Sequence, residues 1–226
     1  MGADSAERVG IVSALPTGPF RVVVADPPWM YQKDPGAKGG GDGASGIAER
    51  EYPTMTNEEI AALPIRDIAA PDAHLFMWIT NPGIYGGRFS DVSPAAIASA
   101  WGFEYRTLLT WVKTVSEGRI DRGGMGWYFR GATEHVLYAT RGKAGIPAAL
   151  REPNVFLAAK GAHSVKPRAF FDLVERVTDG PRLEMFARRP RPGWTVWGNQ
   201  ANGEVLIAPP VDVEQGDLFD LFGGVA

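Results

Sequence analysis

The residues best suited to chemistry are four consecutive ones, Asp26-Pro27-Pro28-Trp29. They directly follow the apolar run of residues 22–25, which predicts a buried strand. The motif therefore comes at the carboxyl end of a strand, where open α/β sheets hold their ligands. This position indicates a loop that binds a ligand or takes part in a reaction.

These residue types suit the activation of an amino group on a flat base. The 6-amino group of adenine is a poor nucleophile because its lone pair is delocalised into the ring. A carboxylate from Asp26 and a carbonyl from Pro27 can accept its two N–H groups and draw the nitrogen toward tetrahedral geometry. The prolines hold these acceptors in place, and Trp29 offers a ring on which a base can stack. The alternative is a rigid, solvent-facing turn capped by a packing tryptophan.

Strands and helices that would position this motif alternate along the chain. Apolar, β-branched and aromatic runs predict strands over residues 21–25, 73–79, 104–112, 134–140, 155–158, 182–187 and 195–198. Helices are predicted from the capping box at Thr56 to about residue 63, over residues 95–101, and from Pro167 to just before Gly180. This alternation indicates an α/β sheet with mostly parallel strands.

The composition is that of a globular domain, with 226 residues, 45% hydrophobic and 22% charged. No run approaches the roughly 18 apolar residues of a membrane span, and the N-terminus lacks the layout of a signal peptide. The chain has no cysteine, so we expect a cytoplasmic protein without disulfides or thiolate metal sites. The net charge of -3 becomes -3 + 4 = +1 without the four acidic residues after position 211, so any nucleic-acid surface is local.

Two long loops lie between the predicted elements. Residues 33–52 follow the motif, hold six glycines and are expected to be mobile. Residues 114–133 mix glycines and arginines with the aromatic run Trp127-Tyr128-Phe129, which suits contacts with phosphates and bases. The alternative for any one of these residues is a solvated loop position. The candidate substrate-binding residues are Tyr31, Lys113, Arg119, Arg122, Trp127 and Arg130.

Several motifs, taken in order, resemble one known family, the MT-A-type adenine N6-methyltransferases, in particular its short bacterial and phage members. The resemblance runs from about residue 20 to residue 203. Beside the Asp-Pro-Pro-Trp motif it rests on Tyr52-Pro53-Thr54-Met55-Thr56, Leu75-Phe76-Met77-Trp78, Thr110-Trp111-Val112-Lys113-Thr114, His163-Ser164-Val165-Lys166-Pro167, Leu183-Glu184-Met185-Phe186-Ala187-Arg188, and Gly193-Trp194 to Trp197-Gly198-Asn199-Gln200. Each motif alone is weak evidence, whereas all of them in one order are strong evidence.

The resemblance implies S-adenosylmethionine as methyl donor, no metal, and a Rossmann-like sheet in permuted order, with the catalytic motif before the cofactor motifs. The catalytic residues implied are Asp26, Pro27, Pro28 and Trp29. The cofactor pocket implied consists of Asp26, Pro28, Lys166, Phe186, Arg188, Asn199 and Gln200. Lys166 would pair with the donor's carboxylate just before a helix N-terminus, which also favours an anion. Asn199 and Gln200 would hold the ribose hydroxyls.

The activity that the resemblance implies is methyl transfer to the 6-amino group of adenine. In a short, cysteine-free chain of this type we expect DNA as the polymer, and the base must leave the stack to reach Asp26. RNA, the 4-amino group of cytosine, and a small-molecule or protein amine stay open as substrates. A catalytically silent, nucleic-acid-binding homologue is a further alternative, although such relatives lose the acidic residue or the second proline, and Asp26 and Pro28 are both present.

The chain is expected to divide into one methyltransferase domain, residues 1–207, and a flexible acidic tail, residues 208–226. The tail carries Gln215, Leu218 and Phe219, which resemble the Gln-x-x-Leu-Phe peptides with which bacterial proteins dock on the replicative sliding clamp. The alternative is that the apolar residues of the tail fold back on the domain as a short amphipathic helix.

Overall fold

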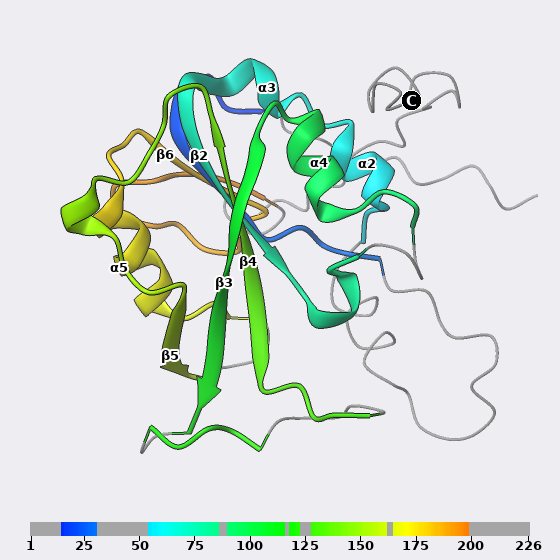
Figure 1. Cartoon of the computed structure of the whole chain (residues 1–226). Helices are drawn as coiled ribbons and strands as arrows, with labels where there is room; N and C mark the ends of the chain where they lie inside the picture. Colours follow the sequence, from blue (N-terminus) through cyan, green and yellow to red (C-terminus); the bar gives the residue numbers. More distant parts are fainter. Residues whose placement is uncertain are drawn as a thin grey trace, which may run out of the picture.

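The computed structural model describes residues 15–30, 54–85, 90–115, 118–122, 128–161 and 165–198. Within these residues seven strands form one sheet in the order β5-β3-β4-β2-β1-β6-β7 (Figure 1). The strands are β1 (Phe20–Ala25), β2 (Ala69–Ile79), β3 (Glu104–Thr114), β4 (Thr133–Arg141), β5 (Val155–Ala159), β6 (Arg182–Met185) and β7 (Thr195–Trp197). Every predicted strand is therefore present.

The sheet is mostly parallel, as predicted, with one exception. β4 runs antiparallel to both of its neighbours, β2 and β3, while the other adjacent pairs are parallel. No helix lies between β3 and β4 in the described part of the chain, so the two strands pair directly and the strict alternation of strands and helices fails there. The result is a mixed α/β sheet, consistent with a Rossmann-like methyltransferase fold. The permuted motif order stays a prediction.

Four α-helices and two 3₁₀ turns connect the strands in these residues: α2 (Asn57–Ala61), α3 (Ile65–Ile68), α4 (Pro94–Ala100), α5 (Arg168–Val177), η1 (Asn81–Gly83) and η2 (Ala148–Leu150). The predicted capping box is formed, since the Thr56 hydroxyl accepts the Glu59 N–H and the Glu59 carboxylate accepts the Thr56 N–H. Ser93 caps α4 through the Ala96 N–H. These local bonds explain why the helices begin where the sequence predicts.

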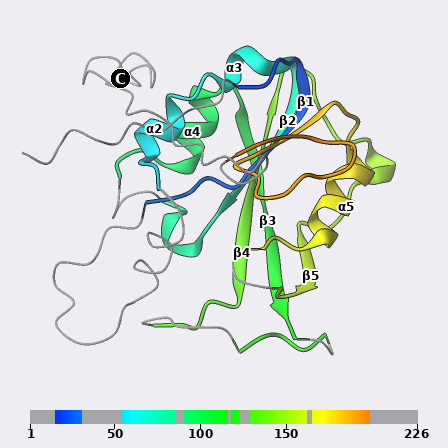
Figure 2. The same ribbon diagram turned by 180° about the vertical axis from the view of Figure 1, so that it is seen from behind.

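The helices cover both faces of the sheet, α2 and α4 on one face and α5 on the other (Figures 1 and 2). The first face packs an apolar cluster that includes Ile60, Leu75 and Ile97. The second packs Phe76, Trp78 and the α5 residues Phe170 and Val174. Successive side chains of β2 therefore enter opposite cores, which is why its sequence is a continuous apolar run.

Two elements differ from the sequence-based prediction. β2 begins at Ala69 rather than at residue 73, because its pairing with β1 is irregular between Phe20 and Val22 and this irregularity accommodates Pro71. The one-turn helix α3 is too short to show a helical pattern of apolar residues. No helix among the described residues is long and apolar enough to span a membrane. The glycine-rich loop 33–52 and the tail 208–226 lie outside the described residues.

Candidate active site

One edge of the sheet brings together charged side chains from four segments. Because β4 runs antiparallel to its neighbours β2 and β3, its first residues lie at the same edge of the sheet as the carboxyl ends of β1, β2 and β3. Asp26 directly follows β1, Lys113 is the penultimate residue of β3 and Glu134 is the second residue of β4. Lys166 precedes α5. This is the edge where α/β sheets hold their ligands.

The backbone of the Asp-Pro-Pro-Trp motif is fixed by hydrogen bonds on both sides. The Pro27 carbonyl accepts the Trp29 N–H at 2.8 Å, which closes a tight turn around Pro28. The Pro28 carbonyl accepts the Met55 N–H at 2.8 Å, and the Met30 N–H donates to the Met55 carbonyl at 3.1 Å. The acceptors of the motif are thus held by the next segment of the chain as well as by the proline rings.

The indole of Trp29 is anchored to β2. Its N–H donates to the Trp78 carbonyl at 3.1 Å, and the half-buried ring packs against the core cluster under α2 and α4. This anchor fixes the plane of the ring. Stacking of a base on Trp29 stays a prediction.

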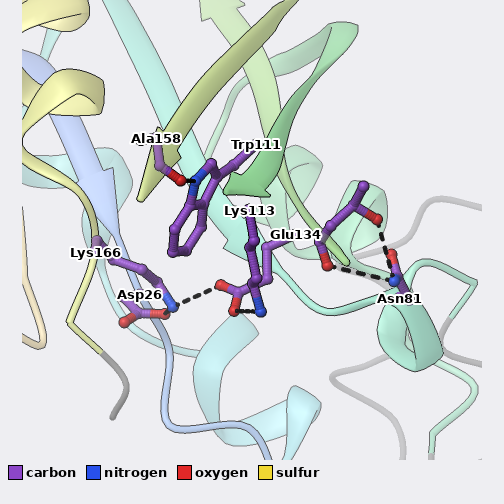
Figure 3. A network of polar contacts seen from close by, with 8 residues as sticks. Asp26, Asn81, Trp111, Lys113, Glu134, Ala158 and Lys166 are labelled. Carbon is purple, nitrogen blue, oxygen red and sulfur yellow. Dashed lines mark hydrogen bonds and ion pairs between the residues drawn. The ribbon is translucent and has the colours of Figure 1, made fainter. Parts of the chain in front are cut away.

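The four charged side chains form a chain of ion pairs (Figure 3). The Lys166 ammonium lies 3.1 Å from Asp26 Oδ1 and 3.1 Å from Glu134 Oε2. The other oxygen of Glu134, Oε1, lies 2.8 Å from the Lys113 ammonium. Signs alternate along the chain, Asp26, Lys166, Glu134, Lys113, so its formal charge is zero.

Each lysine of this network also lies over a tryptophan ring. Lys166 Nζ is 4.9 Å from the ring centre of Trp78, and Lys113 Nζ is 5.3 Å from that of Trp111. The two rings meet edge to face at an angle of 84°, and the Trp111 N–H donates to the Ala158 carbonyl of β5 at 2.9 Å. Cation–π contacts of this kind favour the charged form of lysine where water is excluded.

The ionisable groups respond to this environment in different directions. Burial raises the pKa of Asp26, and the attraction of Lys166 offsets this only in part. Burial also acts to raise the pKa of Glu134, but Lys166 and Lys113 outweigh it and the pKa is lowered. For Lys166, burial acts to lower the pKa, while Asp26 and Glu134 outweigh it and raise the pKa. Lys166 and Glu134 are therefore charged at neutral pH, and Asp26 is the carboxylate whose ionised form this environment disfavours.

Comparison with known proteins identifies the family. A model of the MT-A70 family matches residues 20–200, which is most of the chain. The chain belongs to the MT-A70 family. It is 32% identical over 201 residues to the type II methyltransferase M.MunI of a Mycoplasma species, covering 81% of this chain and 78% of that protein. It is 31% identical over 199 residues to the human N(6)-adenosine-methyltransferase catalytic subunit METTL3, covering 86% of this chain but only 30% of the relative.

This membership confirms the resemblance to a family of adenine N6-methyltransferases that was read from the sequence. The zebrafish METTL3 subunit matches in the same way, at 32% identity over 199 residues and 30% of its length. The chain therefore spans less than a third of the METTL3 relatives, whereas it spans most of M.MunI.

Among the predicted cofactor residues of this MT-A70 chain, Phe186, directly after β6, has an unusual backbone conformation. Phe186 has a φ of +60°, a conformation that a bulky residue adopts rarely and at a cost of about 1–3 kcal/mol. Its ring meets Trp197 edge to face, and Gly198 approaches so closely that a Cβ there would lie 2.4 Å from the Ala187 nitrogen. Arg188 follows and is near enough to Asp26 to lower the pKa of that carboxyl. Strain of this kind concentrates at ligand sites.

The loop between β6 and β7 is fastened by Arg191, which the sequence suggested only as part of a basic patch with Arg188 and Arg189. Its Nε lies 2.8 Å from Glu184 Oε2, and its guanidinium carbon lies 3.3 Å from the ring centre of Phe171 on α5. Burial raises the pKa of Glu184, Arg191 lowers it, and the negative charge of Asp26 raises it further. Glu184 is thus a third carboxylate that acts electrostatically on the same edge.

The predicted residues fall into three groups. Asp26, Lys166 and Arg188 come together, and Lys113 joins them through Glu134. Arg119, Arg122 and Arg130 are exposed on the loop between β3 and β4. Tyr31, Trp127, Asn199, Gln200 and the tail residues Gln215, Leu218 and Phe219 lie outside the described residues, so their roles stay predictions. Within the described residues no cluster of three or more His, Cys, Asp or Glu could hold a metal ion.

Sequence reasoning missed the role of Glu134, which it treated only as the start of a strand. An available signal was its charge at the end of an otherwise apolar strand. A lone carboxylate beside the end of β3, which carries Lys113, is a natural partner for that lysine once the two strands are known to pair.

Proposed function

We propose that this chain is an S-adenosylmethionine-dependent methyltransferase that acts on the 6-amino group of adenine in DNA. The observation that carries the proposal is the placement of Asp26. Its carboxylate stands at the carboxyl end of β1, 30% exposed, on a backbone fixed by prolines and hydrogen bonds. An acceptor that is held rigidly and is still partly exposed is what amine activation requires.

The amine is bound by two acceptors. Asp26 accepts one N–H and the Pro27 carbonyl accepts the other, which localises the nitrogen lone pair for attack on the methyl group. The Pro27 oxygen already accepts the Trp29 N–H, but a carbonyl oxygen has two lone pairs and can accept a second hydrogen bond. After methyl transfer the nitrogen carries a positive charge and becomes acidic. Its proton then passes to Asp26 or to water, and the raised pKa of Asp26 favours the first.

The residues present fit the proposed cofactor. S-adenosylmethionine supplies the methyl group when bound, and it carries a carboxylate, an ammonium and a sulfonium group. Lys166 has three N–H groups, of which two point to Asp26 and Glu134, so one is left for the carboxylate. Asp26 and Glu184 supply the negative potential that suits the cationic groups. Phe186, Arg188, Asn199 and Gln200 complete the proposed pocket on the grounds of family resemblance.

DNA is preferred to RNA on one observation. The chain covers 78% of the Mycoplasma type II methyltransferase but 30% of METTL3, so the match takes in most of the former protein and a minor part of the latter. For either polymer, the exposed Arg122 and Arg130 suit contact with phosphates, because they lie on the loop that follows β3, the strand that carries Lys113 of the ion-pair network. The presence of both Asp26 and Pro28 supports an active enzyme over a silent homologue.

The test is expression in a host that lacks adenine methylation, alongside Asp26→Ala. Nucleoside mass spectrometry of DNA and RNA should show N6-methyladenine in DNA for the natural sequence only. Methyladenine in RNA alone would reassign the polymer. Its absence from both would contradict the activity, and its persistence in Asp26→Ala would contradict the mechanism.

A further inference from the structure

Two adjacent aromatic side chains are almost completely exposed. Tyr128 is 94% and Phe129 is 91% exposed. Phenylalanine is usually buried, because covering its ring removes a large apolar surface from water. An exposed pair of this size at one point of the surface indicates a contact that forms only with a partner.

The pair stands on a loop whose two ends are tied to the active site. At the start of the loop, after β3, the Asp121 N–H donates to the Lys113 carbonyl at 2.8 Å, and Thr114 forms a β-bridge with Ile120. At the end of the loop, just before β4, the Ala132 carbonyl accepts the Lys113 N–H at 2.9 Å. The side chain of Lys113 in turn contacts Glu134, which contacts Lys166 and through it Asp26. The loop is therefore anchored at the residue that links it to the catalytic motif.

The reach of the pair can be bounded from chain geometry. Phe129 is five residues before Glu134, and a fully extended chain spans at most about 3.6 Å per residue, so the Cα atom of Phe129 lies within roughly 18 Å of that of Glu134. With about 3.4 Å between successive bases of a strand, this corresponds to about five nucleotide steps. The exposed guanidinium groups of Arg122 and Arg130 lie on the same loop and suit the phosphates of such a strand.

We infer that Tyr128 and Phe129 form a stacking site for unpaired nucleobases next to the target adenine. The inference rests on the proposed function, since it takes the substrate to be a nucleic acid. Stacking needs only flat faces, so the site tolerates any base, while the neighbouring arginines hold the backbone. The alternative occupant is a protein surface, such as a second copy of this chain.

The test measures binding rather than methyl transfer. The double variant Tyr128→Ser/Phe129→Ser is compared with Tyr128→Phe/Phe129→Tyr, which keeps both rings. Tyr105→Ser is the matched control, because Tyr105 is a 47% exposed aromatic at the opposite end of β3. The probe is a single-stranded DNA oligonucleotide with one adenine, in its normal form and with abasic sites on either side of that adenine.

The serine double variant should bind the normal oligonucleotide about 5- to 100-fold more weakly, whereas the aromatic exchange and Tyr105→Ser should bind as the natural protein does. The abasic probe should weaken binding of the natural protein but not further weaken that of the double variant. In turnover, KM for the oligonucleotide should rise by a similar factor with kcat changed less.

Three outcomes separate the proposals. Binding of the double variant within twofold of the natural protein would overturn the stacking site while leaving the activity untouched. Loss of self-association in sedimentation, with unchanged oligonucleotide binding, would also overturn it and assign the pair to a protein contact. Ring-dependent binding without any methyladenine would support the stacking site and overturn the proposed function alone.

Discussion

Asp26 and Glu134 hold the same lysine from two sides, each at 3.1 Å, yet their pKa values move in opposite directions. Glu134 sits on a strand between Lys166 and Lys113, and two ammonium groups outweigh its burial. Asp26 sits on a loop with Lys166 as its ion-pair partner in the network, and burial prevails. The same edge of the sheet therefore holds one carboxylate that stabilises the fold and one whose charge the fold disfavours.

The difference shows how a reactive group is kept in place. A carboxylate whose ionised form is poorly compensated remains available to accept N–H groups from a ligand. Glu134 keeps Lys166 fixed when Asp26 turns to another partner, because its own contact with Lys166 is independent of Asp26. Stability and function are thus assigned to different members of one network.

The largest effect is expected where the reactive carboxylate is lost. Asp26→Asn keeps the shape of the side chain but replaces an anionic acceptor with a neutral amide. Removal of one such preorganised group costs roughly 100- to 1000-fold in turnover. Initial rates of methyladenine formation, followed by mass spectrometry, measure the change.

The matched control is Asp172→Asn, an exposed aspartate on α5 whose ion pair with Arg168 is at the surface. It should keep the turnover of the natural protein. A loss of less than tenfold in Asp26→Asn would remove Asp26 from the reaction.

Glu134→Gln should mainly affect folding, because it removes the carboxylate that the half-buried Lys113 and Lys166 share. Breaking a buried pair from one side costs about 3–5 kcal/mol, and the 21% exposure of the Glu134 side chain places the expected loss at the lower end of that range. Urea unfolding measures the loss. The double variant Glu134→Gln/Lys113→Met restores the neutrality of the network and should recover most of the lost stability. If the losses of Glu134→Gln and Lys113→Met simply add in the double variant, the ion pair between the two residues does not contribute.

Asp26 and Glu134 should change the stability of the protein in opposite directions as the pH changes. The pKa of Asp26 is raised above 3.8, so its protonated form contributes to the free energy of unfolding. This contribution is complete below pH 3.8 and is lost as the pH rises through the pKa of the folded protein. The pKa of Glu134 is lowered below 4.5, so its contribution is present above that value and is lost as the pH falls through the folded pKa.

At neutral pH the free energy of unfolding should therefore exceed that of the natural protein in Asp26→Asn and fall below it in Glu134→Gln. Both differences should shrink as the solution is acidified toward pH 3. Urea titrations at several pH values give the comparison. If both variants were more stable, or both less stable, than the natural protein at neutral pH, the distinction between Asp26 and Glu134 would be contradicted.

Much of the fold could be predicted because local signals and packing agree. The cap at Thr56 and the apolar face of α5 specify their helices by themselves. Asp26 and Lys166 could be named because family motifs carry them. Glu134 and Arg191 could not, because their roles depend on which strands pair and which loop reaches α5. The antiparallel pairing of β3 with β4 places Glu134, and neither propensity nor periodicity encodes it.

The smallest effect tests the third carboxylate, Glu184, whose pKa is raised by burial and by the charge of Asp26 but is held down by Arg191. Arg191→Met removes that compensation and loosens the loop that carries Arg188. The pair is partly exposed, at 28% and 16%, so we expect a stability loss of about 1 kcal/mol. KM for S-adenosylmethionine should rise a few-fold, with kcat changed less.

Arg191→Lys keeps the charge but not the planar group over Phe171, so it should fall between Arg191→Met and the natural protein. Arg189→Met is the matched control, since Arg189 is exposed on the same loop. Steady-state kinetics with the methyl donor varied distinguishes the cases. If Arg189→Met and Arg191→Met raise KM equally, the charge of the loop matters rather than its attachment to Glu184.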